Sequence, residues 1–347
     1  MQKFFEGNLF SKVQHLVLHG YHFKLNDDHF EKFLSLDIAQ ITINNIDLTS
    51  VSDDLFAKLV NSCKECEIGL NWTQPFLEAN KWITIFDVMR KETKLKSLIL
   101  HCEDQGFIYL PHVPTEILAQ AFNRLESVSL TRVQFGENQL KTICLALTGS
   151  SNMKYLDLQE LDPESDFVAM DMLDAVLTNL RGFSYKPSLL NNPAERLMEL
   201  ANNSCKLKSL DLENFNLKEV PPKLLARVFN KLECLDLLAV TMSEEQTKEV
   251  FRVMSSRTCL KKFVTNQQSN HMSLEFIDHI EKVDPLILAK ALNNIEFLKV
   301  DFPPPITLPQ ILAIFKQLNK QTMIKAILRE PPGENETDLH DDEILYL

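Results

Sequence analysis

Two cysteines give the chain its clearest candidate for metal or redox chemistry. Cys63 and Cys66 form a lone CxxC sequence. A structural zinc site needs at least two further ligands at a compatible spacing, and a redox site is expected in a thioredoxin-like context. Cys63 also falls just before a strand-like apolar phrase, as do Cys205 and Cys259. We therefore interpret these cysteines as small buried residues at the return from a helix to a strand.

Three histidines lie near the start of the chain. His15 and His19 share one face of a predicted strand, and His22 follows them, but no acidic or Cys partner is placed nearby. No Ser/His/Asp or Cys/His triad can be assembled from local residues. Neither GxxxxGK[ST] nor GxGxxG occurs among the eight glycines. We therefore expect no catalytic residue, no metal and no cofactor, and we predict that the protein is not an enzyme.

Composition narrows the class of protein further. The 347 residues are 45% hydrophobic and 24% charged, which is enough apolar material for a large core. A formal net charge of -12 argues against nucleic-acid binding, which needs a basic surface. The sequence contains no run of about 18 apolar residues, so we expect no membrane span, and its first residues lack the hydrophobic run of a signal peptide. Seven scattered cysteines fit reduced thiols in the cytoplasm or nucleus.

The elements that position these residues are indicated by a repeated phrase, L-x-x-L-x-L with apolar substitutes. Its twelve copies are spaced by 25 to 35 residues, which is hard to obtain by chance. Each copy predicts one short strand. The copies begin at residues 13, 38, 65, 95, 125, 153, 180, 207, 232, 260, 295 and 323.

A second phrase precedes every other strand and predicts helices. It occurs as ILAQAFNRLE (117–126), LLARVFNKLE (224–233) and ILAKALNNIE (287–296), with a weaker copy at 172–181. Apolar pairs at i, i+1, i+4 and i+5 form one stripe on a helix. Pro114, Pro221/Pro222 and Pro285 stand just before these helices, where a missing N–H costs little. Units of two kinds therefore alternate, with a double period of about 52 to 63 residues.

Stacking such units predicts a curved α/β solenoid. Parallel strands pack about 4.8 Å apart whereas helices need about 8–10 Å, so the strands line the inner, concave face and the helices the convex face. Twelve strands give an inner arc on the order of 55 Å. We expect an N-terminal cap at 1–12, one solenoid at 13–330 and a tail at 331–347. The tail holds six acids and no Lys or Arg, so we expect it to be disordered or loosely docked and to discourage pairing on the last strand.

This pattern resembles the leucine-rich-repeat family, and within it the ribonuclease-inhibitor-like subclass, over roughly residues 13 to 328. The resemblance implies a helix on the convex face, alternating repeat types and protein binding through the concave face. One position departs from the family, which places Asn or Cys shortly after the third Leu to bond the turn backbone. Here LESVSL is followed by Thr131-Arg132-Val133 and LECLDL by Leu238-Ala239-Val240, so the usual side-chain ladder is not predicted.

Side chains between the last two apolar residues of each phrase are expected to point into the concave face. Gly69 is assigned to this row in the third repeat, and Asp157, Asp211 and Asp236 in later ones. With Glu213, the three aspartates form a candidate acidic patch that would dock a basic protein partner, although an exposed sheet needs polar residues in any case.

A second candidate surface is aromatic. Trp72 lies at the end of the third strand, and Phe107 and Tyr109 lie in the ascending loop of the next unit. Trp and Tyr are enriched among the residues that dominate interface energies. The alternative is a local core under a longer loop.

These features predict a non-catalytic scaffold or inhibitor that binds a partner protein through the concave face. The alternatives are an activator of a partner enzyme, such as a GTPase, or a substrate receptor of a ubiquitin ligase. An activator would need an Arg or Asn at a loop edge, for which Arg132 is the candidate. The oligomeric state is left open.

Overall fold

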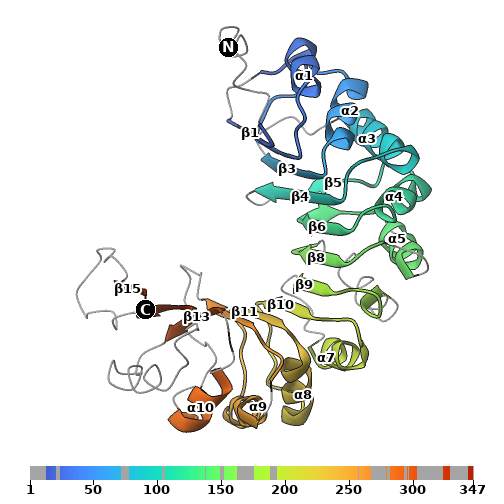
Figure 1. Ribbon diagram of the computed structural model, residues 1–347. Coiled ribbons are helices and arrows are strands. Elements are labelled where there is room, and N and C mark those ends of the chain that lie inside the picture. The colour runs from blue at the N-terminus through green and yellow to red at the C-terminus, as the bar shows by residue number, and fades with distance from the viewer. Residues whose placement is uncertain are drawn as a thin grey trace. The chain divides into compact units, whose positions relative to one another are not determined.

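The computed structural model of the chain divides into two compact units, residues 1–180 and 181–347. In each unit, helices cover one face of a sheet of short strands (Figure 1). The structure describes residues 13–20, 24–71, 78–103, 106–136, 138–148, 152–161, 176–187, 194–256, 258–266, 279, 282–292, 295, 297–302, 323–328 and 343–346.

In the first unit, strands and helices alternate. The strands β1, β2, β3, β4, β6 and β8 pair in that order, all parallel, and β5 pairs with β7 in a small second sheet. The strands span His15–His19 (β1), Gln40–Asn44 (β2), Glu65–Asn71 (β3), Ser97–Glu103 (β4), Ile108–Tyr109 (β5), Ser127–Thr131 (β6), Val133–Gln134 (β7) and Tyr155–Gln159 (β8). The helices span Asp27–Leu34 (α1), Asp53–Ser62 (α2), Ala79–Lys91 (α3), Thr115–Phe122 (α4) and Gln139–Thr148 (α5).

The second unit continues the same alternation. Strands β9 to β14 pair in sequence order, all parallel. They span Gly182–Lys186 (β9), Ser209–Glu213 (β10), Cys234–Leu238 (β11), Lys262–Asn266 (β12), Phe297–Phe302 (β13) and Met323–Leu328 (β14). The described helices span Ala194–Asn203 (α7), Pro222–Lys231 (α8), Glu244–Ser256 (α9) and Pro285–Leu292 (α10). Each of the twelve phrases therefore corresponds to one parallel strand, which confirms the leucine-rich-repeat architecture.

The strand register corrects the expected phrase in the third repeat. Cys66 pairs with Ile41 and Leu98, so it occupies the fourth position of the phrase, and Cys63 occupies the first. The third phrase is CKECEI, starting at residue 63 and not at 65. The CxxC is thus part of the apolar repeat, with both side chains buried. The error arose because Ile68 and Leu70 continue the apolar alternation beyond the phrase.

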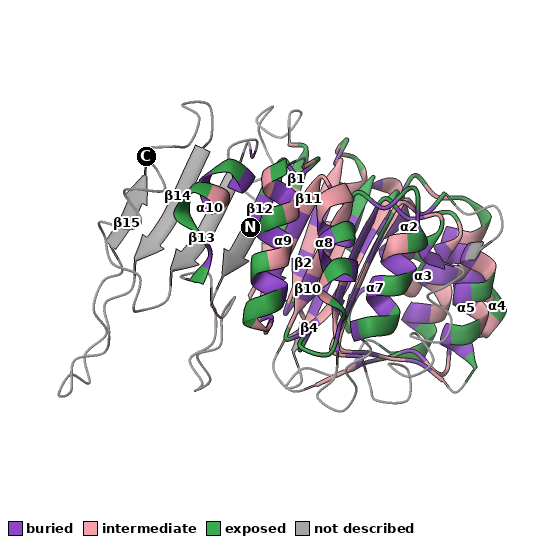
Figure 2. Ribbon diagram, turned by 90° about the horizontal axis from the view of Figure 1, so that it is seen from below, coloured by how far each residue is buried: buried purple, intermediate pink, exposed green. Residues whose placement is uncertain are grey.

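The core of each unit lies between the strands and the helices. Buried residues of the described helices lie along the side that faces the sheet (Figure 2). In α8, for example, Leu224, Leu225, Val228 and Phe229 are all buried, as the repeated helix phrase predicts. Pro114 and Pro221 occupy the N-cap positions of α4 and α8, and α10 begins at Pro285.

The chain turns immediately after several strands through a left-handed residue. Five non-glycine residues, each two positions beyond the third apolar residue of its phrase, have φ between 47° and 58°. They are Asn45, Arg132, Glu160, Asn214 and Ala239. This turn directs the next, apolar residue into the core, as at Val133 and Val240, which are both buried. The apolar residue that stands here in place of the Asn or Cys of the family therefore packs in the core.

Buried glutamines bond the loop backbone where the sequence predicts no side-chain ladder. The Gln139 Nε2 donates to the carbonyls of Leu110, Pro111 and Val113, one repeat earlier, and its Oε1 accepts from the N–H of Gly136. In the second unit, Gln246 bonds the carbonyls of Leu217, Lys218 and Val220 and accepts from the N–H of Ser243. We call each arrangement a glutamine clamp. Each clamp satisfies buried backbone groups that the ladders leave unpaired.

The tail was expected to leave the last repeat strand without a further partner, but part of the tail pairs with that strand. A strand β15, Glu343–Tyr346, pairs antiparallel with β14, and Ile344 stands opposite Ile327. The acidic tail therefore contains a short strand, EILY, whose three consecutive apolar residues have the composition typical of strands. The rest of the tail lies outside the described residues, and the expected boundaries at 12/13 and 330/331 stay predictions.

Truncation of the core should destabilise the stack locally. Leu225 in α8 and Leu235 in β11 are 0% and 1% exposed. We expect Leu225→Ala or Leu235→Ala to lower the free energy of unfolding by about 2–5 kcal/mol, because each leaves a cavity. Since repeats contact mainly their neighbours, hydrogen exchange should rise first around α8 and β11. A uniform rise across all repeats would contradict local coupling.

The glutamine clamp predicts a second stability effect. Gln246→Ala removes donors from three carbonyls, so we expect the free energy of unfolding to fall by about 2–4 kcal/mol. Gln246→Glu keeps the size but replaces the donating amide by an acceptor, and should be at least as destabilising. The exposed neighbour Glu245 supplies the control, since Glu245→Ala should change stability by less than about 0.5 kcal/mol. Chemical unfolding of the full chain measures all three, and equal stability for Gln246→Ala and Glu245→Ala would refute the clamp.

Candidate protein-binding surfaces

The strand face of the first unit carries a chain of polar contacts that crosses four strands. His15 Nε2 lies 3.3 Å from Thr42 Oγ1, and Thr42 Oγ1 donates to a Glu67 carboxylate oxygen at 3.2 Å. The other Glu67 oxygen lies 3.7 Å from His101 Nδ1. His15 therefore contacts a hydroxyl and not an acid, and the carboxylate of this chain, Glu67, lies beside Thr42 and His101. The correct register creates this chain, because it places Glu67 beside Thr42 and not Gly69.

Gly69 lies two residues further along β3 than Glu67. It pairs with Asn44 on β2 and with His101 on β4. A Cβ at Gly69 would lie 2.5 Å from both Asn44 Oδ1 and His101 Nε2. The absence of a side chain lets these two polar groups approach across β3. Asn44 Oδ1 is buried and has no hydrogen-bond partner.

The four acids of the predicted acidic patch do not lie in one unit. Asp157 is in the first unit, where Ser129 Oγ donates to it at 2.7 Å and Gln159 Nε2 at 3.0 Å. In the second unit, Asp211 and Asp236 are directly opposite each other on β10 and β11. Glu213 forms an ion pair with Lys186 at 2.6 Å, which offsets its charge. The structure thus brings together Asp211 and Asp236, while Glu213 is held by Lys186 on the adjacent strand and Asp157 by Ser129 on β6 and Gln159 on its own strand.

The predicted aromatic edge corresponds to a pocket in the first unit. A cavity of about 460 Å³ is lined by Leu70, Trp82, Phe107, Ile108 and Tyr109 among its apolar residues. Trp82 is buried, whereas Tyr109 is 49% exposed at the mouth. Phe107 and Tyr109 both line this pocket, and Trp72 lies outside the described residues. We call this cavity the aromatic pocket.

Three polar residues also line the aromatic pocket: Glu78, His112 and Gln134. The His112 ring stacks on Tyr109 with centroids 6.0 Å apart, and its Nε2 is buried without a hydrogen-bond partner. Burial lowers the pKa of His112 below its ordinary value, because the site disfavours the charged ring. Sequence reasoning missed Glu78, Trp82 and His112, because only the fold brings Leu70, residues 78–82, residues 107–112 and Gln134 together.

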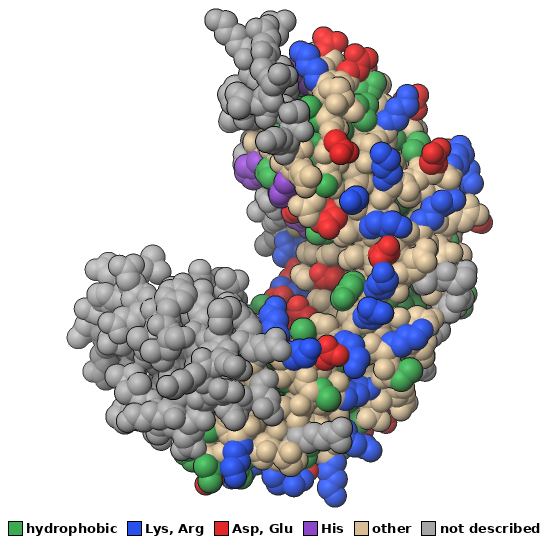
Figure 3. Space-filling view, viewed as in Figure 1, with side chains coloured by type: hydrophobic (Ala, Val, Ile, Leu, Met, Phe, Trp, Pro, Cys, Tyr) green, Lys and Arg blue, Asp and Glu red, His purple; other side chains and the backbone are tan. Residues whose placement is uncertain are grey.

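Arg132, the candidate for activating a partner GTPase, lies at the predicted loop edge. Its guanidinium forms an ion pair with Glu160 one repeat later. The side chain is therefore held at the loop edge by a carboxylate. Figure 3 shows Lys and Arg interspersed with Asp and Glu over the visible described surface, which agrees with a surface of mixed charge.

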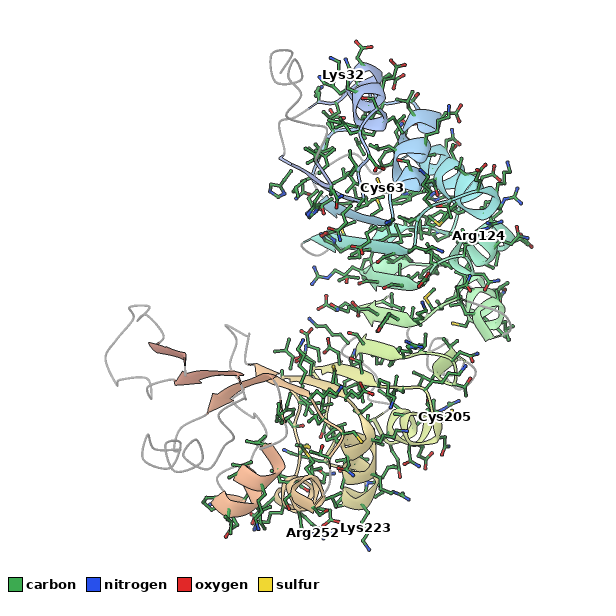
Figure 4. The ribbon with its side chains drawn as sticks, in the orientation of Figure 1. Lys32, Cys63, Arg124, Cys205, Lys223 and Arg252 are labelled. Carbon is green, nitrogen blue, oxygen red and sulfur yellow. The ribbon has the colours of Figure 1, made fainter. Side chains whose placement is uncertain are left out.

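The cysteines divide into buried and exposed groups. Cys63 lies between the strands and helices of the first unit, while Cys205 lies beside α7 (Figure 4). Burial raises the pKa of Cys63 and raises that of Cys66 well above the usual value, and it raises the pKa of Cys144 to about 12. Burial of Cys63 is confirmed, but the same interpretation was wrong for Cys205 and Cys259, which are exposed. Cys63 is itself the first apolar position of its phrase, whereas Cys205 and Cys259 precede Leu207 and Leu260, which hold that buried position.

The described residues hold neither a metal-binding cluster nor a membrane-spanning helix. Within them, no three or more His, Cys, Asp or Glu side chains are grouped so as to hold a metal ion. None of the described helices combines the length and the apolar character needed to cross a membrane. His22 lies outside the described part of the chain.

The difference in burial predicts selective thiol chemistry. A thiol-specific reagent should label Cys205 and Cys259 in the native protein, because both are exposed. Cys63, Cys66, Cys102 and Cys144 are buried and should react slower by roughly 100-fold or more, since labelling requires local opening. Peptide mass spectrometry after a short pulse measures each site, with the unfolded protein as the control. Native labelling of Cys63 as fast as that of Cys205 would contradict this burial.

The chain has distant similarity to solved structures of known proteins. No protein-family model matches the chain, and no curated protein sequence matches it. Among solved structures, the chain is similar to a chain in the crystal structure of the yeast Rad7 and Elc1 complex. The two chains are 16% identical with a TM-score of 0.49, and the match covers 86% of this chain and 78% of the other. This chain is also similar to the leucine-rich-repeat-containing protein LegL7 from Legionella pneumophila, with 14% identity, a TM-score of 0.43, and coverage of 85% and 99%. The paired parallel strands and their helices make this chain a leucine-rich-repeat array.

Proposed function

We propose that the protein is a non-catalytic scaffold or inhibitor that binds a partner protein through the strand face and the aromatic pocket beside it. The observation that carries this proposal is the aromatic pocket with the half-exposed ring of Tyr109 at its mouth. A pocket flanked by an exposed aromatic ring is a typical anchor site of an interface.

The strand face supports the same role. Its polar side chains are held by neighbours on adjacent strands, as in the contacts of Thr42 with Glu67 and of Lys186 with Glu213. Side chains that are already ordered lose less conformational entropy when a partner binds. Val17 and Tyr155, 56% and 49% exposed on the same face, add apolar contact area. This combination suits protein recognition, and we assign the array to the ribonuclease-inhibitor-like subclass.

The cysteines and the net charge bear on the compartment and on the kind of partner. All seven cysteines are thiols outside any disulfide, which supports a reducing compartment such as the cytoplasm or nucleus. The net charge of -12 favours a basic protein partner over nucleic acid. Asp211 and Asp236 are the part of the acidic patch that would meet such a partner in the second unit.

The test begins with partner capture by the full chain and cross-linking mass spectrometry. We expect cross-links at Lys186 and Lys262 on the strands rather than at Lys223 and Lys248 on α8 and α9. Lys223 extends away from the strands (Figure 4), so it reports on the opposite face. Cross-links confined to the helix face would overturn the proposal.

Affinity measurements on the captured partner then separate the two surfaces. Tyr109→Ala should weaken binding by about 10-fold or more, which is the loss expected of an anchoring aromatic. Asp211→Asn with Asp236→Asn should weaken binding to a basic partner and flatten its salt dependence. Lys223→Gln, a matched exposed control, should have no effect. Unchanged affinity for all strand-face and pocket variants would refute the proposal.

A further inference from the structure

We propose that the aromatic pocket receives an arginine side chain of the partner protein. This inference rests on the proposed protein-binding function and adds the chemistry of the group that occupies the pocket. It is carried by the rings and the hydrogen-bond acceptors that the pocket presents together.

The pocket is large enough for a long side chain and has aromatic walls. Its volume of about 460 Å³ lies within the range of ligand sites in proteins. Trp82, Phe107 and Tyr109 contribute rings to the lining. The face of such a ring attracts a cation, and a planar guanidinium can also stack on it. The apolar residues Leu70 and Ile108 suit the methylene stem of the same side chain.

The polar groups in the lining can accept hydrogen bonds from such a cation. Glu78 contributes an exposed carboxylate next to the start of α3. Among described carboxylates of the same unit, Asp53 and Asp87 are both ion-paired. Among the described residues Glu78 forms no ion pair, and its exposed carboxylate is accessible to a cation in the pocket.

His112 adds a second acceptor deeper in the lining. Its Nε2 is buried and makes no hydrogen bond. The lowered pKa of the ring favours the neutral imidazole, in which one nitrogen accepts a hydrogen bond. In the tautomer with the proton on Nδ1, Nε2 is that acceptor. The Gln134 side chain can present its carbonyl oxygen as a third.

Arginine satisfies this set better than other side chains do. Its guanidinium has five N–H donors in a plane and no acceptor, so it can bond several acceptors while it stacks on a ring. A lysine ammonium is compact and more strongly hydrated, and it stacks less well. An aspartate or glutamate would meet the repulsion of Glu78, and a leucine would leave the buried Nε2 of His112 without a partner.

The experiment uses the full chain and short peptides of sequence acetyl-Gly-Gly-X-Gly-Gly-amide. The central residue X is arginine, citrulline, lysine or leucine. Citrulline has nearly the shape of arginine but no charge. Methyl chemical shifts of Ile108 and Leu70, measured by NMR, report on occupation of the pocket. We expect the arginine peptide to shift both methyl groups and to bind about 10-fold more tightly than the citrulline peptide.

Variants assign the discrimination to named groups. Glu78→Gln should weaken the arginine peptide by about 5-fold to 10-fold and reduce its advantage over citrulline. Tyr109→Ala should weaken both peptides, because it removes a stacking surface. Glu116→Gln is the matched control, since Glu116 is also exposed near the start of a helix, α4, but does not line the pocket. It should leave every affinity unchanged.

Three results would overturn the inference. They are equal binding of the arginine and citrulline peptides, tighter binding of the leucine peptide, and the absence of shifts at Ile108 and Leu70 up to the solubility limit of the arginine peptide. Failure of the arginine inference can be distinguished from failure of the proposed protein-binding function. A captured partner that needs Tyr109 or the strand face but tolerates Glu78→Gln would keep the scaffold function and reject arginine as the anchor.

Discussion

The parallel backbone ladder is the constraint on which the rest of the structure depends. Each strand must pair with the next in one register, so a residue at a given position lies beside its counterpart in the neighbouring repeat. The alternation of side chains then sends one set to the core and the other to the exposed strand face. Cys63 and Cys66 illustrate the strength of this constraint. A pair of residues with the spacing of a metal or redox motif becomes two apolar positions of a repeat, and burial raises the pKa values of both thiols.

Beyond the ends of the strands, loops place backbone carbonyls inside the protein, where they need hydrogen-bond donors that the ladder does not supply. Two glutamines meet this need in equivalent ways, since Gln139 and Gln246 each bond three carbonyls of the preceding repeat. This arrangement leaves the position after the left-handed turn available for an apolar residue such as Val133 or Val240. The protein thus keeps the leucine-rich-repeat architecture with a different set of side chains bonding its loops, because the requirement applies to the backbone and not to a particular residue.

Ion pairing on the strand face shows why acidic residues alone are a poor guide to a binding surface. Glu213 is offset by Lys186, and Asp157 accepts hydrogen bonds from Ser129 and Gln159, so part of the predicted acidic patch is engaged within the protein. The aromatic pocket differs because its lining combines the exposed carboxylate of Glu78 with a buried nitrogen, Nε2 of His112, that makes no hydrogen bond. Unbonded polar atoms beside aromatic rings are a stronger sign of a binding site than a list of charges, since burying them without a partner costs free energy.

The sequence by itself determined the repeat, the strand and helix order and most of the core, because apolar spacing reflects which side of each element is shielded from water. It also indicated Phe107 and Tyr109 as neighbours. Tertiary structure decided three further features: the register of the third repeat, the pairing of β15 with β14, and the assembly of Glu78, Trp82 and His112 around one cavity. Apolar residues run past the end of the third phrase, so local spacing leaves its register ambiguous. Strand pairing and pocket lining depend on contacts between segments far apart in the chain, and local periodicity carries no information about those contacts.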